Sequence, residues 1–431
     1  MKRTPALALA LAVLLSTTLA SAQTPPGDDK TPVTEVTDLV NTLLGGLLGT
    51  GQVTGEKLQK DVEEAGGLPF RRDVPLAFLG KDELAAYLKG VLDDEYPAPR
   101  ARADERLLEA FDLLPPATDL RALRARVLEE NVAGFYDERP GKRRLFAVSE
   151  DRSFSPMNQI VLVHELRHAL QDQYEDLGSF LPDDVSDFDD RRMAWVSLLE
   201  GDATFVMERF VELRLGSLGL PIGGAGDDAG GVALGVPGLL DVPGAPPVVR
   251  DQLVQPYLVG LQFARALWAR GGASALRDAW RKPPESTEQV LHPDKFFARE
   301  RPRSVSPTLP APPGARLVSE GVLGELLIRT LVGEGAESAA AGWGGDGWRL
   351  WDVGGRTALA WRSEWDVGAS AVAFHSALRA RFARLGSPSI QAGWEVFPGA
   401  GGRRFAVRRS GDAVELASAE DGALLGTLIG R

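Results

Sequence analysis

The chain has 431 residues, 44% of them hydrophobic, and its 48 basic and 60 acidic residues give a formal net charge of −12. This length and composition exclude a disordered protein and predict a sizeable core divided into two or more domains. The acidic balance argues against nucleic-acid binding, which needs basic surface, and the absence of cysteine excludes disulfides, thiol catalysis and a lipoprotein anchor.

The N-terminus has the pattern of a secretory signal peptide over residues 1–22. Lys2 and Arg3 precede a short apolar run, and small residues end the segment. We expect cleavage after Ala22 and an exported protein, either secreted or held in the periplasm or cell envelope. The apolar run is shorter than a membrane span, and no later stretch has about eighteen uninterrupted apolar residues, so we expect no stable membrane span after cleavage.

Residues 23–62 are expected to form a flexible N-terminal segment, because a Pro-, Gly- and Asp-rich stretch is followed there by a Leu/Gly stretch. From residue 63 the pattern becomes globular, and residues 63–301 form the expected catalytic domain, a mainly helical unit with a small sheet. Its expected early elements are a strand at 74–79, helices at 81–92, 103–113 and 118–130, and a hairpin of strands at 132–136 and 144–148.

The stretch His164-Glu165-x-x-His168 brings two imidazoles and a carboxylate within about one helical turn. Residues four apart project from nearly the same face of a helix, so the two histidines converge on one metal ion while Glu165 is rotated by about 100°. An apolar stripe through the motif and a Ser-Pro pair before it predict a helix here. The pattern favours a catalytic zinc site over a structural metal site or an incidental surface pair.

A catalytic zinc site needs a third protein ligand. Residues 169–174 contain neither glycine nor histidine, which excludes a metzincin-type site. Glu200 interrupts a strongly apolar helical segment, and a buried carboxylate needs a metal ion or strong hydrogen bonds, so we predict Glu200 as the third ligand. The alternatives are that Glu200 pairs with an arginine such as Arg191 or Arg192, or that Asp202 is the ligand.

The motif followed by Glu200 on a second helix resembles the gluzincins, the thermolysin-like metallopeptidases. The resemblance implies that His164, His168 and Glu200 bind one Zn²⁺ per chain and that Glu165 is the general base. In that family an aspartate four residues after the ligand glutamate orients a histidine, whereas this chain has Thr204 at that position. The resemblance therefore does not say which residue orients the histidines here.

A wider resemblance is to a group of uncharacterised exported bacterial proteins in which His-Glu-Leu-x-His-Ala-Leu-Gln-Asp-Gln precedes a Glu-Gly-Asp-Ala-type helix. It covers most of the mature chain and implies a peptidase without naming a substrate. The matching stretches are residues 66–70, 134–137, 164–173, 200–203, 256–257, 286–293 and 342–346.

The chemistry expected of such a site follows from the ion. Zinc lowers the pKa of its bound water toward about 7, and Glu165 takes the proton and returns it to the leaving amine. Gluzincins commonly stabilise the oxyanion with a tyrosine or histidine downstream of the third ligand, and Tyr257 and His292 qualify by type. The alternative roles are a core-anchoring aromatic for Tyr257 and a loop histidine that caps backbone for His292.

The substrate is expected to be a protein or peptide. Zincin-like folds place a strand beside the cleft, where its edge pairs with an extended peptide, and residues 134–137 or 145–148 are candidates for this strand or for ordinary sheet structure. Residues 216–249 are rich in Gly, Pro and Ala and are expected to form a flexible insertion or a lid. A helical pattern resumes at 258–281.

Residues 302–313 are rich in proline and are expected to link the catalytic domain to a C-terminal α+β domain at 314–431. Six of the nine tryptophans fall in this domain, where we expect them in the core, and His375 is expected to be structural. Its predicted elements are strands at 348–353, 357–361, 393–396, 404–408 and 413–417 around a helix at 369–385.

The sequence therefore predicts an α+β protein with a zincin-like catalytic domain, and an exported zinc metallopeptidase that hydrolyses peptide bonds. The alternative is a zincin-fold binding or structural envelope protein without turnover. Glu165 favours the enzyme, because a protein that only binds has no chemical need for a carboxylate beside the first histidine.

Overall fold

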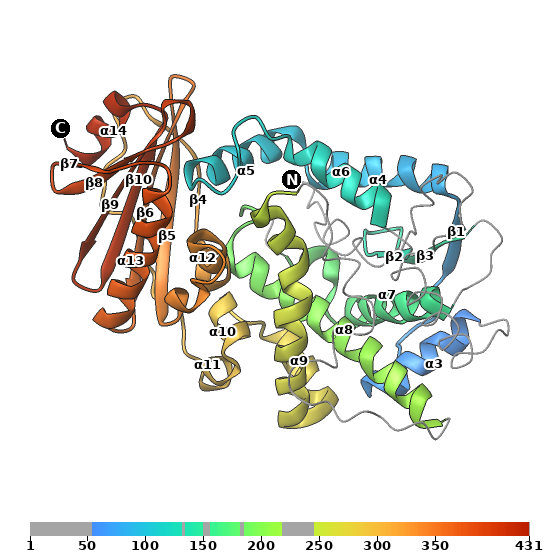
Figure 1. Cartoon of the computed structure of the whole chain (residues 1–431). Coiled ribbons are helices and arrows are strands. Elements are labelled where there is room, and N and C mark those ends of the chain that lie inside the picture. Colours follow the sequence, from blue (N-terminus) through green and yellow to red (C-terminus); the bar gives the residue numbers. More distant parts are fainter. Residues whose placement is uncertain (1–53, 132–133, 150–155, 182–184, 218–244, 431) are drawn as a thin grey trace, which may run out of the picture.

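The computed structural model describes residues 54–131, 134–149, 156–181, 185–217 and 245–430. The fold class is α+β, as the sequence predicts: a mainly helical half with a small sheet precedes a half built on a seven-stranded sheet (Figure 1). The expected signal peptide at 1–22 and most of the insertion at 216–249 lie outside the described residues. Among the described helices, none is long and apolar enough to cross a membrane.

Three long helices cross in the helical half (Figure 1). They are α7 (Pro156–Glu175), α8 (Asp190–Ser217) and α9 (Pro247–Arg281). The backbones of α8 and α9 touch at one point, because a Cβ added to Gly201 would lie 2.0 Å from the carbonyl carbon of Gly260. Glycine at both positions permits this approach. The contact lies next to Glu200 in α8 and within one turn of Tyr257 in α9, so it sets how closely the two helices present these side chains.

The helix α9 begins earlier than the helix expected at 258–281. Pro256 lacks an N–H and normally marks a helix boundary, which is why the sequence predicts a later start. In the structure the helix begins at Pro247 and continues through Pro256. The preceding turns remain helical because Val249 and Val254 are buried in the core.

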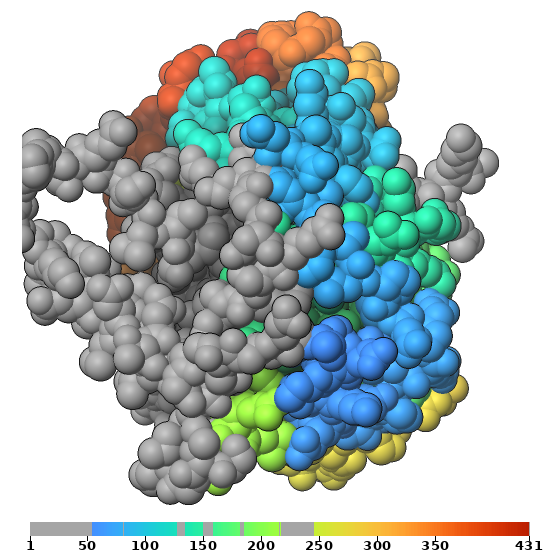
Figure 2. All heavy atoms as spheres, turned by 90° about the vertical axis from the view of Figure 1, so that its right-hand side faces the viewer, coloured from blue at the N-terminus to red at the C-terminus, as the bar shows by residue number. Residues whose placement is uncertain are grey.

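A short helix, α3 (Gly55–Gly66), lies where the sequence predicts the end of a flexible segment. The Thr54 hydroxyl accepts a hydrogen bond from the Lys57 N–H and caps its first turn, and Gly67 ends it with a φ of 67°. Buried side chains of α3 pack on α7 and α8. Residues 55–62 are therefore helical and packed, whereas the sequence predicts a flexible segment there. Figure 2 shows α3, in darker blue, on one face of the molecule.

The small sheet lies beside α7 in the order β1-β3-β2. Strand β1 pairs with β3 in parallel, and β2 pairs with β3 antiparallel, as a hairpin requires. The predicted elements of this region are present with boundaries shifted by a few residues. They are β1 (Leu76–Leu79), α4 (Lys81–Glu95), α5 (Ala98–Ala110), α6 (Leu120–Asn131), β2 (Gly134–Asp137) and β3 (Arg144–Val148).

The C-terminal half is an antiparallel sheet in the order β4-β5-β6-β10-β9-β8-β7. The helix α13 packs on one face and α14 on the other. All six tryptophans of this half are buried, as expected. The elements are β4 (Arg316–Gly321), α12 (Gly324–Val332), β5 (Trp343–Val353), β6 (Arg356–Trp365), α13 (Gly368–Ala383), β7 (Ser389–Gln391), β8 (Trp394–Pro398), β9 (Arg404–Ser410), β10 (Ala413–Ala419) and α14 (Gly422–Ile429).

A buried carboxylate, Asp346, ties α12 to the large sheet. It accepts hydrogen bonds of 2.9 Å from the backbone N–H groups of Leu323 and Gly324 and from the indole N–H groups of Trp343 and Trp361. Four N–H donors satisfy both oxygen atoms of the carboxylate in an apolar setting. A neutral side chain of the same size could not accept all four hydrogen bonds in this way. The Trp-Gly-Gly-Asp stretch that begins at Trp343 is therefore structural in this fold.

The two halves are joined through α10 (Thr287–Leu291), α11 (Pro293–Ala298) and α12. The Thr287 hydroxyl and backbone N–H both donate to Asp190 at the start of α8, and the same hydroxyl accepts from the Leu326 N–H. The proline-rich stretch at 302–313 has no regular secondary structure. It follows the sheet, since the Arg303 N–H donates to the Gly344 carbonyl at 2.7 Å.

Candidate metal centre

The helix α7 carries its motif in the interior of the protein. His164, Glu165 and His168 have no exposed surface, because α3, α8, α9 and the small sheet all pack around α7. Apolar residues between the polar ones explain the burial, for example Val163 and Leu166, which are both at most 1% exposed. The motif therefore lies at the meeting point of several elements, as a preorganised site requires.

His164, His168 and Glu200 form one compact donor group. The two Nε2 atoms are 2.9 Å apart, and they lie 3.2 Å and 3.5 Å from the Glu200 Oε2 atom, respectively. Two ligands that each lie about 2.0–2.1 Å from a tetrahedral zinc are about 3.3 Å apart. The three observed separations bracket that value, so this donor set fits zinc.

The pKa shifts of His164, His168 and Glu200 are compatible with the binding of a cation. Burial lowers the pKa of His164 to about 4, so the ring is neutral and one of its two nitrogen atoms carries a lone pair that can bind a metal ion. Burial also acts to lower the pKa of His168, but the charge of Glu200 and its hydrogen bond outweigh burial and raise that pKa above 6.5. The same contacts with His168 hold the pKa of Glu200 below its usual value despite burial. A bound cation would supply positive charge to Glu200 in place of a proton on His168.

Glu165 lies next to the donor group on α7. Its Oε2 atom accepts a 2.9 Å hydrogen bond from the Tyr136 N–H of β2, whereas its Oε1 atom has no hydrogen-bond partner among the described residues. Burial raises the pKa of Glu165 to about 8, an effect that His168 opposes and Glu200 supports. The carboxyl group is thus held by one oxygen and has a pKa close to the range in which proton transfer at neutral pH is efficient.

Tyr257 of α9 also lies at the site. Its ring centroid is 6.0 Å from that of His164, and its side chain is buried. Burial, the charges of Glu200 and Glu165, and a hydrogen bond to Glu200 raise the pKa of the Tyr257 phenol well above 10. The phenol therefore keeps its proton and remains a hydrogen-bond donor beside the donor group.

The structure does not bring His292 to this group. His292 lies between α10 and α11, and its Nε2 atom is 2.9 Å from the Oε2 atom of Glu325 on α12. Glu325 is fully buried and also pairs with Arg329 at 2.6 Å. His292 is therefore part of the contact between the two halves of the protein, and this is the physical reason that it does not reach the donor group.

We expect the His292–Glu325 contact to make stability depend on pH. The hydrogen bond that the His292 ring donates to Glu325 raises the pKa of His292 above 6.5, so the contact stabilises the folded state most at low pH and is lost as the pH rises through the raised pKa. His292→Gln should therefore lower the melting temperature more at about pH 5.5 than at about pH 8.5. Thermal unfolding at the two pH values tests this, and an equal decrease at both would contradict it.

Two polar residues near the donor group, Arg167 and Gln171, were not singled out in the sequence analysis. Asp202, the substitute ligand considered above, is instead bound by Arg167 through two hydrogen bonds of 2.9 Å and 3.0 Å. Gln171 donates to Asp202 at 2.7 Å and contacts the Nδ1 atom of His168 at 2.8 Å. One sequence signal could have indicated the contact between Gln171 and His168. The two residues are three positions apart on one helix, so their side chains are neighbours.

The alternative partners for Glu200 are engaged elsewhere. Arg192 pairs with Asp187 at 3.1 Å, in a buried network with Arg124. The Arg191 guanidinium lies over the Trp195 ring, 5.9 Å from the ring centre. Glu200 thus faces the histidines, and no arginine neutralises it among the ion pairs of the described residues.

A second group of acidic side chains, Glu288, Glu300 and Asp366, also meets the spacing of a metal site. The Lys295 ammonium lies 2.7 Å, 2.7 Å and 3.0 Å from these three carboxylates. The lysine already supplies the positive charge that the group needs, so we assign it no metal.

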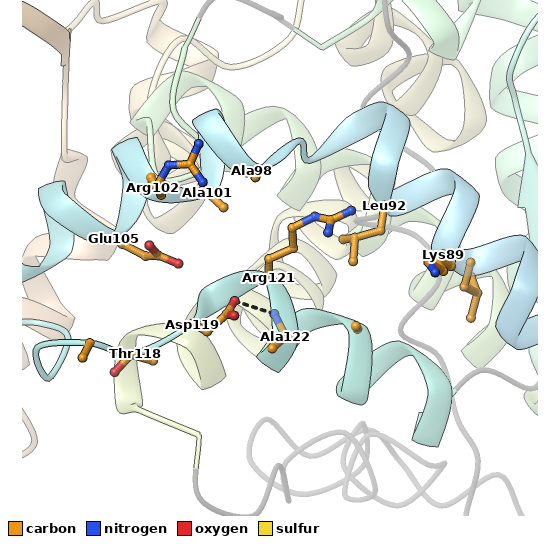
Figure 3. A pocket seen from close by; sticks show the side chains of 13 residues that line it. Lys89, Leu92, Ala98, Ala101, Arg102, Glu105, Thr118, Asp119, Arg121 and Ala122 are labelled. Carbon is orange, nitrogen blue, oxygen red and sulfur yellow. Dashed lines mark hydrogen bonds between the residues drawn. The ribbon is translucent and has the colours of Figure 1, made fainter.

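A cavity with a volume of about 610 Å³ lies between α4, α5 and α6, away from the metal centre. Figure 3 shows Arg121 and Glu105 directed into it. Its polar groups have local partners: Glu105 accepts from the Leu120 N–H at 3.0 Å, and Asp119 accepts from the Ala122 N–H at 2.8 Å. None of the metal-centre residues lines this cavity.

Comparison with known proteins identifies one region of similarity. Residues 315–428 match a family model described as "Domain of unknown function (DUF8575)". No curated protein and no solved structure matches the chain. The match runs from β4 to α14, so it covers the C-terminal sheet and leaves α7, α8 and their donor group outside it.

Proposed function

We propose that this chain is an exported zinc-dependent metallopeptidase that hydrolyses peptide bonds. The observation that supports this most is the convergence of the His164, His168 and Glu200 donor atoms within 4.8 Å of one another, beside Glu165. Three protein ligands with a neighbouring carboxylate are typical of catalytic zinc, whereas structural zinc usually has four protein ligands. The export signal at 1–22 supports action outside the cytoplasm.

Each residue has a distinct task in this proposal. Zinc, when held by these three ligands, supplies a Lewis acid that polarises a carbonyl and acidifies water. Glu165 accepts the proton of the attacking water on its free Oε1 atom and delivers it to the leaving amine. Its other oxygen stays on the Tyr136 N–H, which fixes the orientation of the carboxyl group.

Strand β2 is the expected binding position of the substrate. It is an edge strand of the small sheet, since β3 is its only partner among the described strands. Its Tyr136 N–H contacts Glu165, so the edge lies directly beside the reacting groups. An extended peptide that pairs with this edge would present its backbone carbonyl groups to the metal centre, which favours peptides over other hydrolysable substrates.

Tyr257→Phe is expected to lower kcat at saturating zinc by about 10²-fold, because the phenol is a hydrogen-bond donor for the oxyanion and all three metal ligands remain. Steady-state kinetics on a cleaved peptide give the measurement. Tyr174→Phe is the matched control, since this tyrosine of α7 donates to the Pro69 carbonyl away from the site. A Tyr257→Phe variant with wild-type kcat would remove this residue from the mechanism.

The experiment that tests the proposed function uses the purified mature chain and a peptide library. The zinc-loaded chain should cleave peptides, removal of zinc with a chelator should stop cleavage, and added zinc should restore it. Cleavage that persists without metal would exclude zinc catalysis. Zinc binding without any cleavage would instead favour a binding protein that retains the metal but catalyses no reaction.

A further inference from the structure

Gln171 connects a metal-ligand histidine to a buried ion pair. Its Oε1 atom is 2.8 Å from the Nδ1 atom of His168, and its Nε2 atom donates to Asp202 at 2.7 Å and to the Leu199 carbonyl at 3.1 Å. All four residues are at most 2% exposed. The amide therefore lies between His168 on α7 and two acceptors on α8, shielded from water.

The direction of the Gln171 amide follows from its neighbours. The Asp202 carboxylate and the Leu199 carbonyl only accept hydrogen bonds, so the NH₂ group must face them and the carbonyl oxygen must face His168. A carbonyl oxygen only accepts as well. The Nδ1 atom of His168 must therefore carry a hydrogen, and in the neutral ring the lone pair is on Nε2, which faces His164 and Glu200.

Asp202 is held in turn by Arg167. The guanidinium donates to both carboxylate oxygens, both side chains are fully buried, and the guanidinium lies 4.9 Å from the centre of the Trp280 ring. A bidentate ion pair in a dry environment cannot rotate without loss of a charged hydrogen bond. The carboxylate is therefore a fixed acceptor, and it fixes the amide.

We propose that Gln171, held by Asp202 and Arg167, is the positioning residue that keeps Nδ1 of His168 protonated and presents its Nε2 atom to the metal. This inference rests on the proposed zinc function and adds to it a residue that touches neither metal nor substrate. The position at which gluzincins carry an orienting aspartate holds Thr204, and its hydroxyl has no hydrogen-bond partner among the described residues. In this chain Gln171 orients a histidine instead, and it lies on α7 and not on α8.

Zinc affinity gives the first test, measured by competition with a chromophoric chelator. Gln171→Met keeps the shape of the side chain and removes both hydrogen-bonding functions, and it should weaken zinc binding by about 10- to 100-fold. Gln173→Met is the matched control on the same helix. The Gln173 side chain accepts from the Arg71 and Arg72 N–H groups, away from the donor group, so this variant should keep wild-type affinity.

The nitrogen resonances of the His168 ring give a second test that a purely structural role would not change. In the zinc-loaded wild-type chain, Nε2 should be the coordinating atom and the Nδ1 hydrogen should be protected from exchange. Gln171→Met should lose that protection.

The outcomes separate this inference from the proposed function. Gln171→Met with unchanged zinc affinity, or coordination through Nδ1 in the wild-type chain, would overturn the role of Gln171 while zinc binding stands. A wild-type chain that binds zinc as described but cleaves no peptide would overturn the peptidase and leave the role of Gln171 intact. A wild-type chain that binds no zinc would overturn both.

Discussion

Glu165→Gln is expected to bind zinc like the wild-type chain and to lose peptide hydrolysis by about 10³- to 10⁴-fold, the upper range for a general acid–base residue. Glu165 is not a ligand: its Oε2 atom is bound to the Tyr136 N–H, and its Oε1 atom is free among the described residues. Glutamine keeps the size of the side chain and the acceptor for Tyr136, but it cannot take up a proton. Metal content and kcat, measured on the same sample, are the readouts.

The control for this variant is Glu208→Gln. Glu208 is on α8 and pairs with Arg265 of α9 near the surface, so its replacement removes a carboxylate charge without touching the site. It should leave zinc content and turnover near wild-type values. If Glu165→Gln hydrolysed peptides at a rate close to that of Glu208→Gln, Glu165 would have no role as a base and the mechanism would have to be abandoned.

Glu200→Ala is expected to weaken zinc binding on the order of 100-fold and to abolish activity at limiting zinc. Four-ligand zinc sites bind with about 10–16 kcal/mol, or about 3 kcal/mol for each ligand, which corresponds to roughly two orders of magnitude in affinity. The loss should be at least as large as for a residue that only orients a ligand. Alanine favours helix, so the variant should keep the structure of α8 apart from the lost side chain.

Competition with a chelator measures this change, and Glu208→Ala, two turns further along α8, is its control. The control should bind zinc like the wild-type chain. Equal affinities for Glu200→Ala and Glu208→Ala would show that the third ligand lies elsewhere. The resemblance to gluzincins would then rest on the histidine motif alone.

Much of the donor group could be predicted from the sequence because its signals are local. The spacing of His164 and His168 is a property of one helix, and Glu200 stood out as a carboxylate in a strongly apolar helical segment. The structure brings all three together. Tyr257 was placed at the site through the family resemblance, and the glycine contact between α8 and α9 now gives a physical reason for its position.

His292 and Gln171 show where sequence reasoning stops. His292 pairs with Glu325, which is 33 residues further along the chain and in the other half of the protein. No local sequence pattern predicts such a partner. Gln171 looks like an ordinary polar helix residue. Its importance depends on Asp202, 31 residues away, and on burial that only the packing of α8 against α7 creates.

Element boundaries depended in the same way on tertiary packing. The sequence predicts a flexible segment up to residue 62, whereas burial of Leu58, Val62 and Ala65 orders α3 from Gly55. The strands β4 and β7 at the two edges of the large sheet were not predicted. Both are mostly exposed and lack the alternation of polar and apolar residues that marks a half-buried strand.

The most direct test of the central claim is the zinc content of the purified mature chain, measured by elemental analysis after incubation with zinc and removal of free metal. The geometry of His164, His168 and Glu200 predicts about one zinc per chain. A chain that holds no zinc after this treatment would contradict the account. The buried donor group would then be a hydrogen-bonded core cluster, and the protein would have to be considered a binding or structural protein.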